Sequence, residues 1–311
     1  MMHGIAVVGA GNMGRAHARA WAARGLGDRI RYVCSRRPVE AFPHAAAARS
    51  VVDLDDVLGD PDVDLLSVCT PTPTHAEIAI RALDAGRNVL LEKPIALTVR
   101  DAEAIAAAES ASPGRLMVAH VVRFASGYRR VLGEARAGRL GRVREVRAER
   151  RSEPPGWADW FADEARSGGP LVDFAIHDFD QVNLLLGRPV AVSTEQRGEH
   201  GRLETRIEYA DGGVGHVVTC AAMPEGTPFS STLDATGDGG TASCRVPGAG
   251  PDDPFARQAS SFLKAIDSGA QPEVTIASAT VALRVALAAR ESLHSGRPVE
   301  LEQHEPAPAV G

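Results

Sequence analysis

Hydrophobic residues in the first 120 positions alternate between short continuous runs and longer stretches with helical spacing. The short runs are rich in Val, Ile and Leu, which is typical of strands buried on both faces of a sheet. They fall at residues 5–8, 30–34, 65–69, 89–91 and 116–119. Helices are predicted between them. One begins at Thr74, where Glu77 three residues later completes a capping-box pattern, and ends at Gly86. The alternation predicts βαβ units and a parallel sheet.

The pattern changes after Arg123. Apolar and polar residues alternate from Leu203 to Tyr209, and an Asp-Gly-Gly turn leads into a second strand at 214–220. This predicts an antiparallel hairpin with one face in water. A helix over 171–186 is expected to start at Pro170. Further elements are predicted at residues 127–137, 142–151, 254–268 and 277–295.

These elements predict an α/β protein with two domains, which suits a chain of 311 residues. Residues 1–121 are expected to form a doubly wound parallel sheet with its helices. Residues 122–302 are expected to form an α+β domain with an open, mainly antiparallel sheet. The Pro-rich polar end, residues 303–311, is expected to be disordered.

The composition of the chain argues against several classes of function. No apolar run approaches the ~20 residues that a membrane span requires, and the N-terminus has no secretory signal pattern, so a cytoplasmic protein is expected. The net charge of −6 gives no general reason to bind nucleic acid. The four cysteines are scattered without metal-ligand spacing, so no metal is expected.

A glycine motif follows the first predicted strand and opens a helix, the context in which G-x-G-x-x-G indicates dinucleotide binding. The first glycine permits the turn, the second lets backbone approach the pyrophosphate, and the third allows close packing. A glycine turn without a ligand is the alternative. The cofactor-binding residues expected here are Gly9, Gly11, Asn12, Met13 and Gly14.

The second strand ends in Ser35, Arg36 and Arg37, where NAD-binding sites usually carry an acidic residue for the ribose hydroxyls. A hydroxyl and two guanidiniums suit a 2′-phosphate better, so NADP(H) is slightly favoured over NAD(H). Alternatively, Arg36 stacks on the adenine or faces solvent.

Two further strands end at the same expected crevice. The third is followed by Thr70, Pro71, Thr72 and His75, which are expected to line the cofactor together with Glu92 and Lys93 after the fourth strand. Of the 34 lysines and arginines only Lys93 and Lys264 are lysine, so an ammonium at position 93 indicates specific chemistry more than a random surface charge.

Asp173 and His177 lie four residues apart near the start of the predicted helix and therefore on one face. An imidazole beside a carboxylate is typical of general acid–base catalysis, although a surface pair or a core histidine would give the same pattern.

These motifs, with His17, Arg123-Phe124 and Asp180, occur in an order and spacing that resembles the Gfo/Idh/MocA family over nearly the whole chain. The resemblance implies a Rossmann domain followed by an open mixed sheet, and assigns Lys93, Asp173 and His177 as the catalytic residues. In this resemblance, Pro94 matches a proline of the family that is often preceded by a cis peptide. Pro170 replaces a common glycine, and Ser35-Arg36 replaces the acidic residue of NAD-preferring members.

The expected activity is NAD(P)-dependent interconversion of a secondary alcohol and a ketone on a sugar, cyclitol or related polyol. Besides the catalytic residues, His120, Arg123, Trp157 and Trp160 are candidates for substrate binding. The partners expected are this small molecule and further copies of the chain, as a homodimer or homotetramer through the C-terminal sheet. The alternatives are an NAD-dependent glycosidase of the same fold and a non-catalytic cofactor sensor.

Overall fold

The computed structural model describes residues 4–154, 163–247 and 252–302 of the chain. Tertiary contacts divide the chain into two compact units. The first comprises Met1–Ser126, Ala158–Gly169 and Gly250–Leu283, and the second comprises Gly127–Trp157, Pro170–Ala249 and Arg284–Gly311. Residues 250–283, far along the chain, thus pack with the N-terminal unit. The expected boundary near residue 121 stays a prediction, and the expected disordered tail lies outside the described residues.

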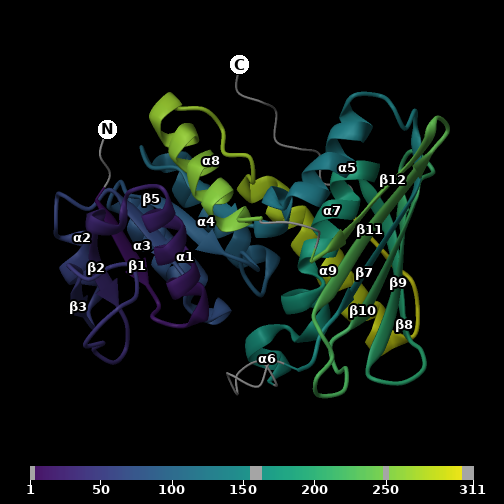
Figure 1. The fold of residues 1–311 in the computed structure, drawn as a ribbon. Helices are drawn as coiled ribbons and strands as arrows, with labels where there is room; N and C mark the ends of the chain where they lie inside the picture. Colours follow the sequence, from purple (N-terminus) through teal and green to yellow (C-terminus); the bar gives the residue numbers. More distant parts are fainter. Residues whose placement is uncertain (1–3, 155–162, 248–251, 303–311) are drawn as a thin grey trace. The chain divides into compact units, whose positions relative to one another are not determined.

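The first unit is built on a six-stranded sheet in the order β3-β2-β1-β4-β5-β6 (Figure 1). All of its strand pairs are parallel, which confirms the doubly wound α/β prediction. Its strands are β1 (Ile5–Val8), β2 (Ile30–Cys34), β3 (Arg49–Val51), β4 (Leu65–Val68), β5 (Asn88–Glu92) and β6 (Leu116–Ala119). β1, β4 and β6 are buried at every position.

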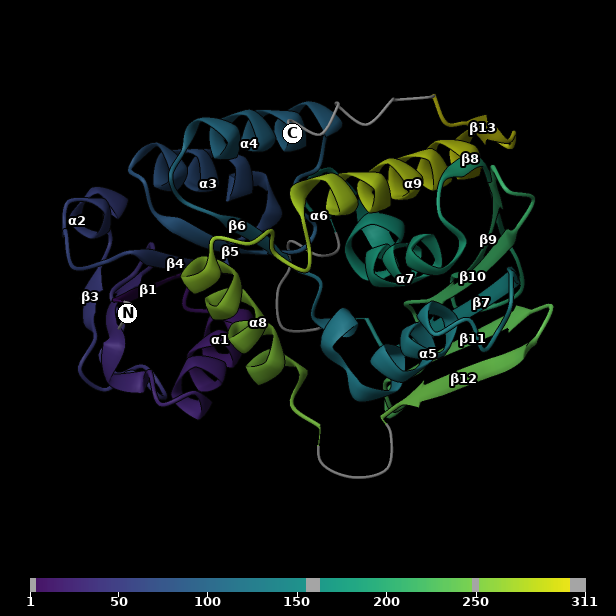
Figure 2. The same cartoon turned by 90° about the horizontal axis from the view of Figure 1, so that it is seen from above.

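Helices cover both faces of this sheet. Figure 2 shows α3 and α4 on one side and α1 with α8 on the other, and contacts between α1 and α8 and between α3 and α4 tie each pair together. The helices are α1 (Asn12–Ala23), α2 (Leu54–Leu58), α3 (His75–Asp84), α4 (Val99–Ala111), α6 (Glu164–Ser167) and α8 (Pro254–Ser268). Short 3₁₀ turns, η2 (Thr72–Thr74) and η3 (Val121–Phe124), follow β4 and β6.

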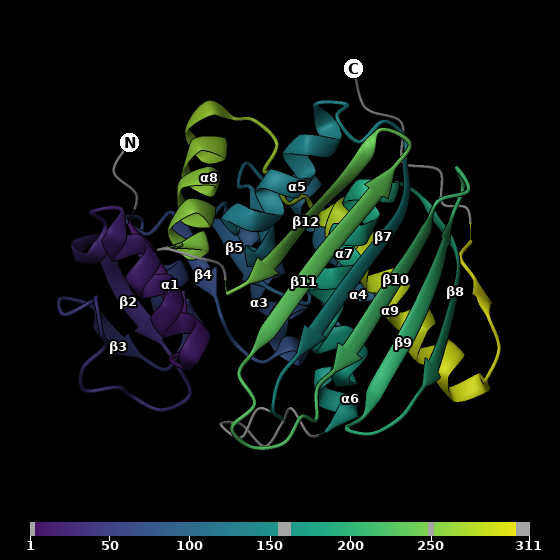
Figure 3. The ribbon, with the colours of Figure 1, turned by 45° about the vertical axis from the view of Figure 1, so that its right-hand side comes forward.

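The second unit contains a seven-stranded sheet in the order β12-β11-β7-β10-β9-β8-β13 (Figure 3). Its central pair, β7 and β10, is parallel and the other pairs are antiparallel, as predicted for an open, mainly antiparallel sheet. The strands are β7 (Val143–Arg151), β8 (Pro189–Gln196), β9 (Arg202–Tyr209), β10 (Val214–Cys220), β11 (Ser230–Gly237), β12 (Gly240–Val246) and β13 (Val299–Glu300).

One face of this sheet packs on helices α5 (Ser126–Arg136), α7 (Ile176–Leu186) and the end of α9 (Ile276–Ser295) (Figure 2). The alternating residues of β9 turn Leu203 and Ile207 towards this core, where both are buried. The opposite face is mostly polar, with Arg206 and Glu208 exposed on β9, and it also contains Val214 and Val218 of β10. The expectation that association covers outer apolar positions of this sheet stays a prediction.

No helix in the part of the chain that the structure describes combines the length and the apolar character needed to cross a membrane.

Candidate active site

The parallel sheet of the first unit gathers its chemistry-bearing turns at one edge. Parallel strands have their carboxyl ends on the same side, and ligands of open α/β sheets bind there. The segments at the carboxyl ends of β1, β2, β4, β5 and β6 contain residues 9–14, 35–37, 70–75, 92–94 and 120–123. Every cofactor-binding residue expected from the sequence lies in one of the first four of these segments.

The glycine turn has the geometry that a dinucleotide pyrophosphate requires. Gly9 has φ 104°, and a Cβ on it would lie 2.5 Å from the Cys69 carbonyl oxygen. A Cβ on Gly14 would lie 2.0 Å from the Gly9 carbonyl oxygen, whereas a Cβ on Gly11 would meet nothing within 4 Å. Gly9 and Gly14 are therefore required by packing within the protein, and Gly11 leaves an open approach to the backbone.

The N-terminus of α1 offers free backbone donors beside that approach. Its N-cap, Gly11, supplies no capping side chain, so the first-turn amides of Asn12, Met13 and Gly14 are not used by a cap. Unpaired amides and the positive end of the helix dipole favour a phosphate group. The residues present thus fit a dinucleotide.

Ser35, Arg36 and Arg37 follow β2 at the same edge. The Ser35 hydroxyl donates to the Arg37 carbonyl at 2.5 Å, which closes a tight turn. Both arginines are exposed. Their contact with a ribose or its phosphate stays a prediction.

The turn after β4 is fixed by its own hydroxyl groups. Thr74 Oγ1 donates to Thr70 Oγ1 at 2.7 Å and lies 2.9 Å from the Pro71 carbonyl oxygen. The predicted capping box at Thr74 is wrong, because this hydroxyl points back into the turn and makes no cap hydrogen bond at the start of α3. Thr72 is buried in the 3₁₀ turn.

His75 connects this turn with the next one. Its Nδ1 lies 2.8 Å from the Pro94 carbonyl oxygen and its Nε2 lies 2.9 Å from the Thr70 carbonyl oxygen. Carbonyl oxygens only accept, so a neutral ring donates to one of them and an imidazolium to both. Burial lowers the pKa of His75, while the two carbonyls and the Glu92 carboxylate oppose that shift.

Glu92 ends β5 with a buried carboxylate that contacts two parts of the unit. Its Oε1 lies 2.9 Å from His17 Nε2 on α1, and its Oε2 accepts the Lys93 backbone N–H at 3.1 Å. Burial alone would raise the pKa of Glu92, but His17 and the charge of Lys93 hold that pKa below its usual value. Lys93 itself is half-buried, and its peptide bond to Pro94 is cis, as the family resemblance implied.

His120 and Arg123 lie after β6 and are both buried. The Arg123 guanidinium donates to the Glu273 carbonyl at 3.0 Å and to the Ser278 hydroxyl at 3.1 Å, which ties η3 to the start of α9 and to the segment before it. Substrate contact by either residue stays a prediction. Trp157 and Trp160 lie outside the described residues.

Asp173 and His177 belong to the second unit. The predicted continuous helix over 171–186 is instead a π-helical turn at Pro170–Phe174 followed by α7, and the Ala175 amide bonds the Pro170 carbonyl at 2.9 Å. Asp173 lies in the π-turn, and His177 is the second residue of α7. π-helical turns occur frequently at functional sites.

A buried ion pair next to His177 was not found from the sequence. Arg150 on β7 holds Asp178 through two bonds, Nε to Oδ2 at 2.7 Å and the second guanidinium nitrogen to Oδ1 at 2.9 Å. The ring centroids of Phe174 and Phe229 each lie 5.6 Å from the guanidinium carbon of Arg150. Burial raises the pKa of Asp178, and Arg150 opposes that rise. Alternation along β7 puts Arg150 on the same face as the buried Val146 and Ala148. This alternation is the sequence signal that could have indicated a buried arginine.

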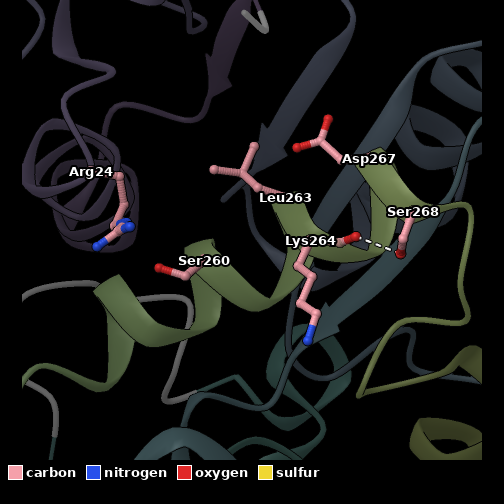
Figure 4. A pocket seen from close by; sticks show the side chains of 6 residues that line it. All are labelled: Arg24, Ser260, Leu263, Lys264, Asp267 and Ser268. Carbon is pink, nitrogen blue, oxygen red and sulfur yellow. Dashed lines mark hydrogen bonds between the residues drawn. The ribbon is translucent and has the colours of Figure 1, made fainter. Parts of the chain in front are cut away.

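A hollow of about 420 Å³ lies at the other end of α1 from the glycine turn. Figure 4 shows that Lys264 and Asp267 extend from α8 in different directions, so their charges do not converge. The second lysine of the chain is thus an exposed helix residue. The hollow is lined by Arg24, Ser260, Leu263, Lys264, Asp267 and Ser268.

Comparison with known proteins agrees with this arrangement. Residues 3–120 match the family described as "Oxidoreductase family, NAD-binding Rossmann fold", and residues 128–243 match "GFO/IDH/MocA C-terminal domain". The chain is 25% identical to scyllo-inositol 2-dehydrogenase (NAD(+)) of Bacillus subtilis over 96% of both chains.

Solved structures give the same result. GenD2 from gentamicin A biosynthesis, in complex with NAD, superposes with a TM-score of 0.85 at 27% identity and covers 97% of both chains. A putative myo-inositol dehydrogenase from Sinorhizobium meliloti 1021 gives a TM-score of 0.81 at 26% identity, covering 96% of this chain and 99% of that one.

Proposed function

The chain belongs to the Gfo/Idh/MocA oxidoreductase family, and from this premise we propose that it interconverts a secondary alcohol and a ketone on a sugar or cyclitol. The observation that supports this most is the joint placement of an uncapped glycine turn and Lys93 at one edge of the parallel sheet. The similar proteins named as inositol dehydrogenases support a polyol substrate.

The first unit would hold NAD(P) with the Gly9–Gly14 turn against the pyrophosphate. When bound, this cofactor supplies hydride transfer at its nicotinamide ring. Arg36 and Arg37 are exposed after β2 and carry no acidic neighbour in their turn, which supports acceptance of NADP(H) beside NAD(H).

The reacting oxygen is handled by three side chains. In the oxidation direction, His177 accepts the hydroxyl proton, and Lys93 donates a hydrogen bond to the same oxygen as negative charge develops. Asp173 holds the substrate or the imidazole. This assignment rests on the match of these residues to the family's motifs.

The test is a panel of cyclitols, aldoses and keto-sugars, assayed by nicotinamide absorbance with NAD and with NADP. Turnover of at least one polyol is expected. Sugar cleavage without a net change in absorbance would identify a glycosidase instead. Tight cofactor binding with no turnover on the whole panel would favour a sensor.

A further inference from the structure

Glu92 is placed to act on Lys93, not on a ligand. The Glu92 side chain is 5% exposed, and each carboxylate oxygen already has a partner within the first unit. A buried carboxylate is costly unless it is paired and hydrogen-bonded, so both contacts are needed for the charge to persist there. An anion turned towards phosphates would in addition repel them.

The two partners of Glu92 have different functions. His17 lies on α1, the helix whose N-terminus faces the proposed pyrophosphate, and it is 1% exposed. The other partner is the backbone N–H of Lys93. The chain His17–Glu92–Lys93 thus connects the phosphate-binding helix with the residue proposed to act on the substrate.

The turn is held on its other side as well. The carbonyl of Pro94 lies 2.8 Å from His75 Nδ1, so the backbone is held before and after the Lys93–Pro94 peptide. A backbone that is fixed on both sides limits where the Lys93 ammonium can reach.

We propose that Glu92, oriented by His17, is a positioning residue that fixes the backbone of Lys93 relative to α1. This rests on the proposed function only for the role of Lys93 in turnover. The sequence predicted that Glu92 contacts the cofactor directly. In the present proposal, Glu92 instead acts through Lys93.

The test compares Glu92→Ala and Glu92→Gln with Glu109→Gln. Glu109 is a matched control because it is a part-buried carboxylate of the same unit that also accepts a backbone amide, Leu116 N–H, at 2.8 Å. That contact lies at the start of β6, the opposite end of the sheet from Lys93.

The first readout needs no cofactor or substrate. Hydrogen exchange at the Lys93 amide should accelerate by about tenfold or more in Glu92→Ala, as expected when a protected amide loses its acceptor. Glu109→Gln should leave that amide unchanged. If Glu92→Ala does not fold, Glu92→Gln carries the same comparison, with a smaller acceleration because its amide oxygen can still accept.

The second readout separates positioning from binding. At saturating cofactor, turnover by the Glu92 variants should fall by about ten- to a hundredfold, while the Kd for the dinucleotide changes by less than about threefold. Weaker dinucleotide binding with normal turnover at saturation would overturn the proposal and restore the direct contact. Unchanged exchange and turnover would equally overturn it. If the wild-type protein turns over no polyol, the proposed function fails, and hydrogen exchange still decides this proposal.

Discussion

Single residues of the first unit differ in how their charge is used. Lys93 is half-buried after β5, whereas Lys264 is exposed on α8. All other basic side chains among the 34 lysines and arginines are arginines. The partly buried lysine, Lys93, lies directly after β5, at the edge of the sheet where the dinucleotide is expected to bind. An ammonium is a compact donor that can release its proton, and a guanidinium is a wide planar donor that cannot.

We therefore expect Lys93→Arg to lower turnover by roughly a hundredfold while dinucleotide affinity stays nearly unchanged. Steady-state kinetics on a verified polyol, together with cofactor titration, measure both quantities. Lys264→Arg is the matched control and should behave as wild type. Near-normal turnover by Lys93→Arg would contradict a catalytic ammonium.

Arg36 supports a separate prediction about cofactor choice. Its guanidinium is exposed after β2, where the adenosine ribose is expected. Arg36→Ala should weaken the binding of NADP(H) by about tenfold and the binding of NAD(H) much less, because only NADP(H) carries the 2′-phosphate. Fluorescence titration with each cofactor measures the difference. Equal effects on both, or none, would leave Arg36 as a solvated side chain.

The local motifs of the site could be predicted from the sequence because each is a short run after a strand. The contacts between them could not. His17 and Glu92 are separated by 75 positions, and Arg150 and Asp178 by 28. Such pairs depend on which elements become neighbours, and no local pattern specifies that.

At the scale of elements, different glycines of the turn after β1 serve different needs: Gly14 allows close packing, and Gly11 leaves room for the ligand. Gly14→Ala would push a Cβ to 2.0 Å from the Gly9 carbonyl oxygen and should cost about 1–3 kcal/mol of unfolding free energy. Gly11→Ala meets no neighbour within 4 Å and should unfold like wild type. It should nevertheless bind dinucleotide at least about tenfold more weakly, since its methyl group occupies the pyrophosphate approach. Denaturant unfolding and cofactor titration separate the two effects, and unchanged affinity in Gly11→Ala would contradict the approach.

The π-turn before α7 shows the limit of element prediction. Proline at the first helical position and a periodic apolar pattern indicated one helix over 171–186, yet the bond from Ala175 to Pro170 spans five residues. The start of α7 is instead fixed by the buried bonds between Arg150 and Asp178, which come from a distant strand.

Arg150→Met should therefore destabilise the protein by about 3–5 kcal/mol, because it leaves the Asp178 carboxylate buried without its partner. Burial already raises the pKa of Asp178, and loss of Arg150 removes the opposing charge. The folded variant then favours the protonated acid, so its deficit should shrink as the pH falls. Unfolding measured across acidic and neutral pH checks the sign. Arg150→Met with Asp178→Asn should recover part of the loss, and a deficit independent of pH would contradict this account.

On the scale of the whole molecule, the sequence predicted both sheet types but not the full second sheet. Strands β8, β11, β12 and β13 escaped prediction, as did β3 in the first unit. β11 alternates Ser, Thr and Asp outward with Leu233 and Ala235 inward, a pattern too small and polar to resemble a strand. Such segments become strands because β7 offers an unpaired edge, which is a property of the assembled sheet.

The outer face of that sheet gives the prediction about assembly a new physical basis. Arg206, His216 and Arg147 stand side by side on β9, β10 and β7, and Glu208 and Glu145 flank Val214 in the adjacent row. Rows of opposite charge make the face self-complementary under a two-fold rotation, since a cationic row of one copy can meet an anionic row of the other. The expected homodimer or homotetramer would then be held largely by charge.

Such an assembly should weaken with salt, because exposed charges are screened over ~3 Å at 1 M ionic strength compared with ~10 Å at 0.1 M. Light scattering at micromolar concentration should give a dimer or tetramer mass at low salt and a smaller mass at ~1 M NaCl. Arg147→Glu with Arg206→Glu should lower the mass even at low salt, because it places like charges opposite each other, whereas Arg24→Glu on the first unit should not. A mass that grows with salt would indicate an apolar interface elsewhere, and a monomer at every ionic strength would contradict self-association altogether.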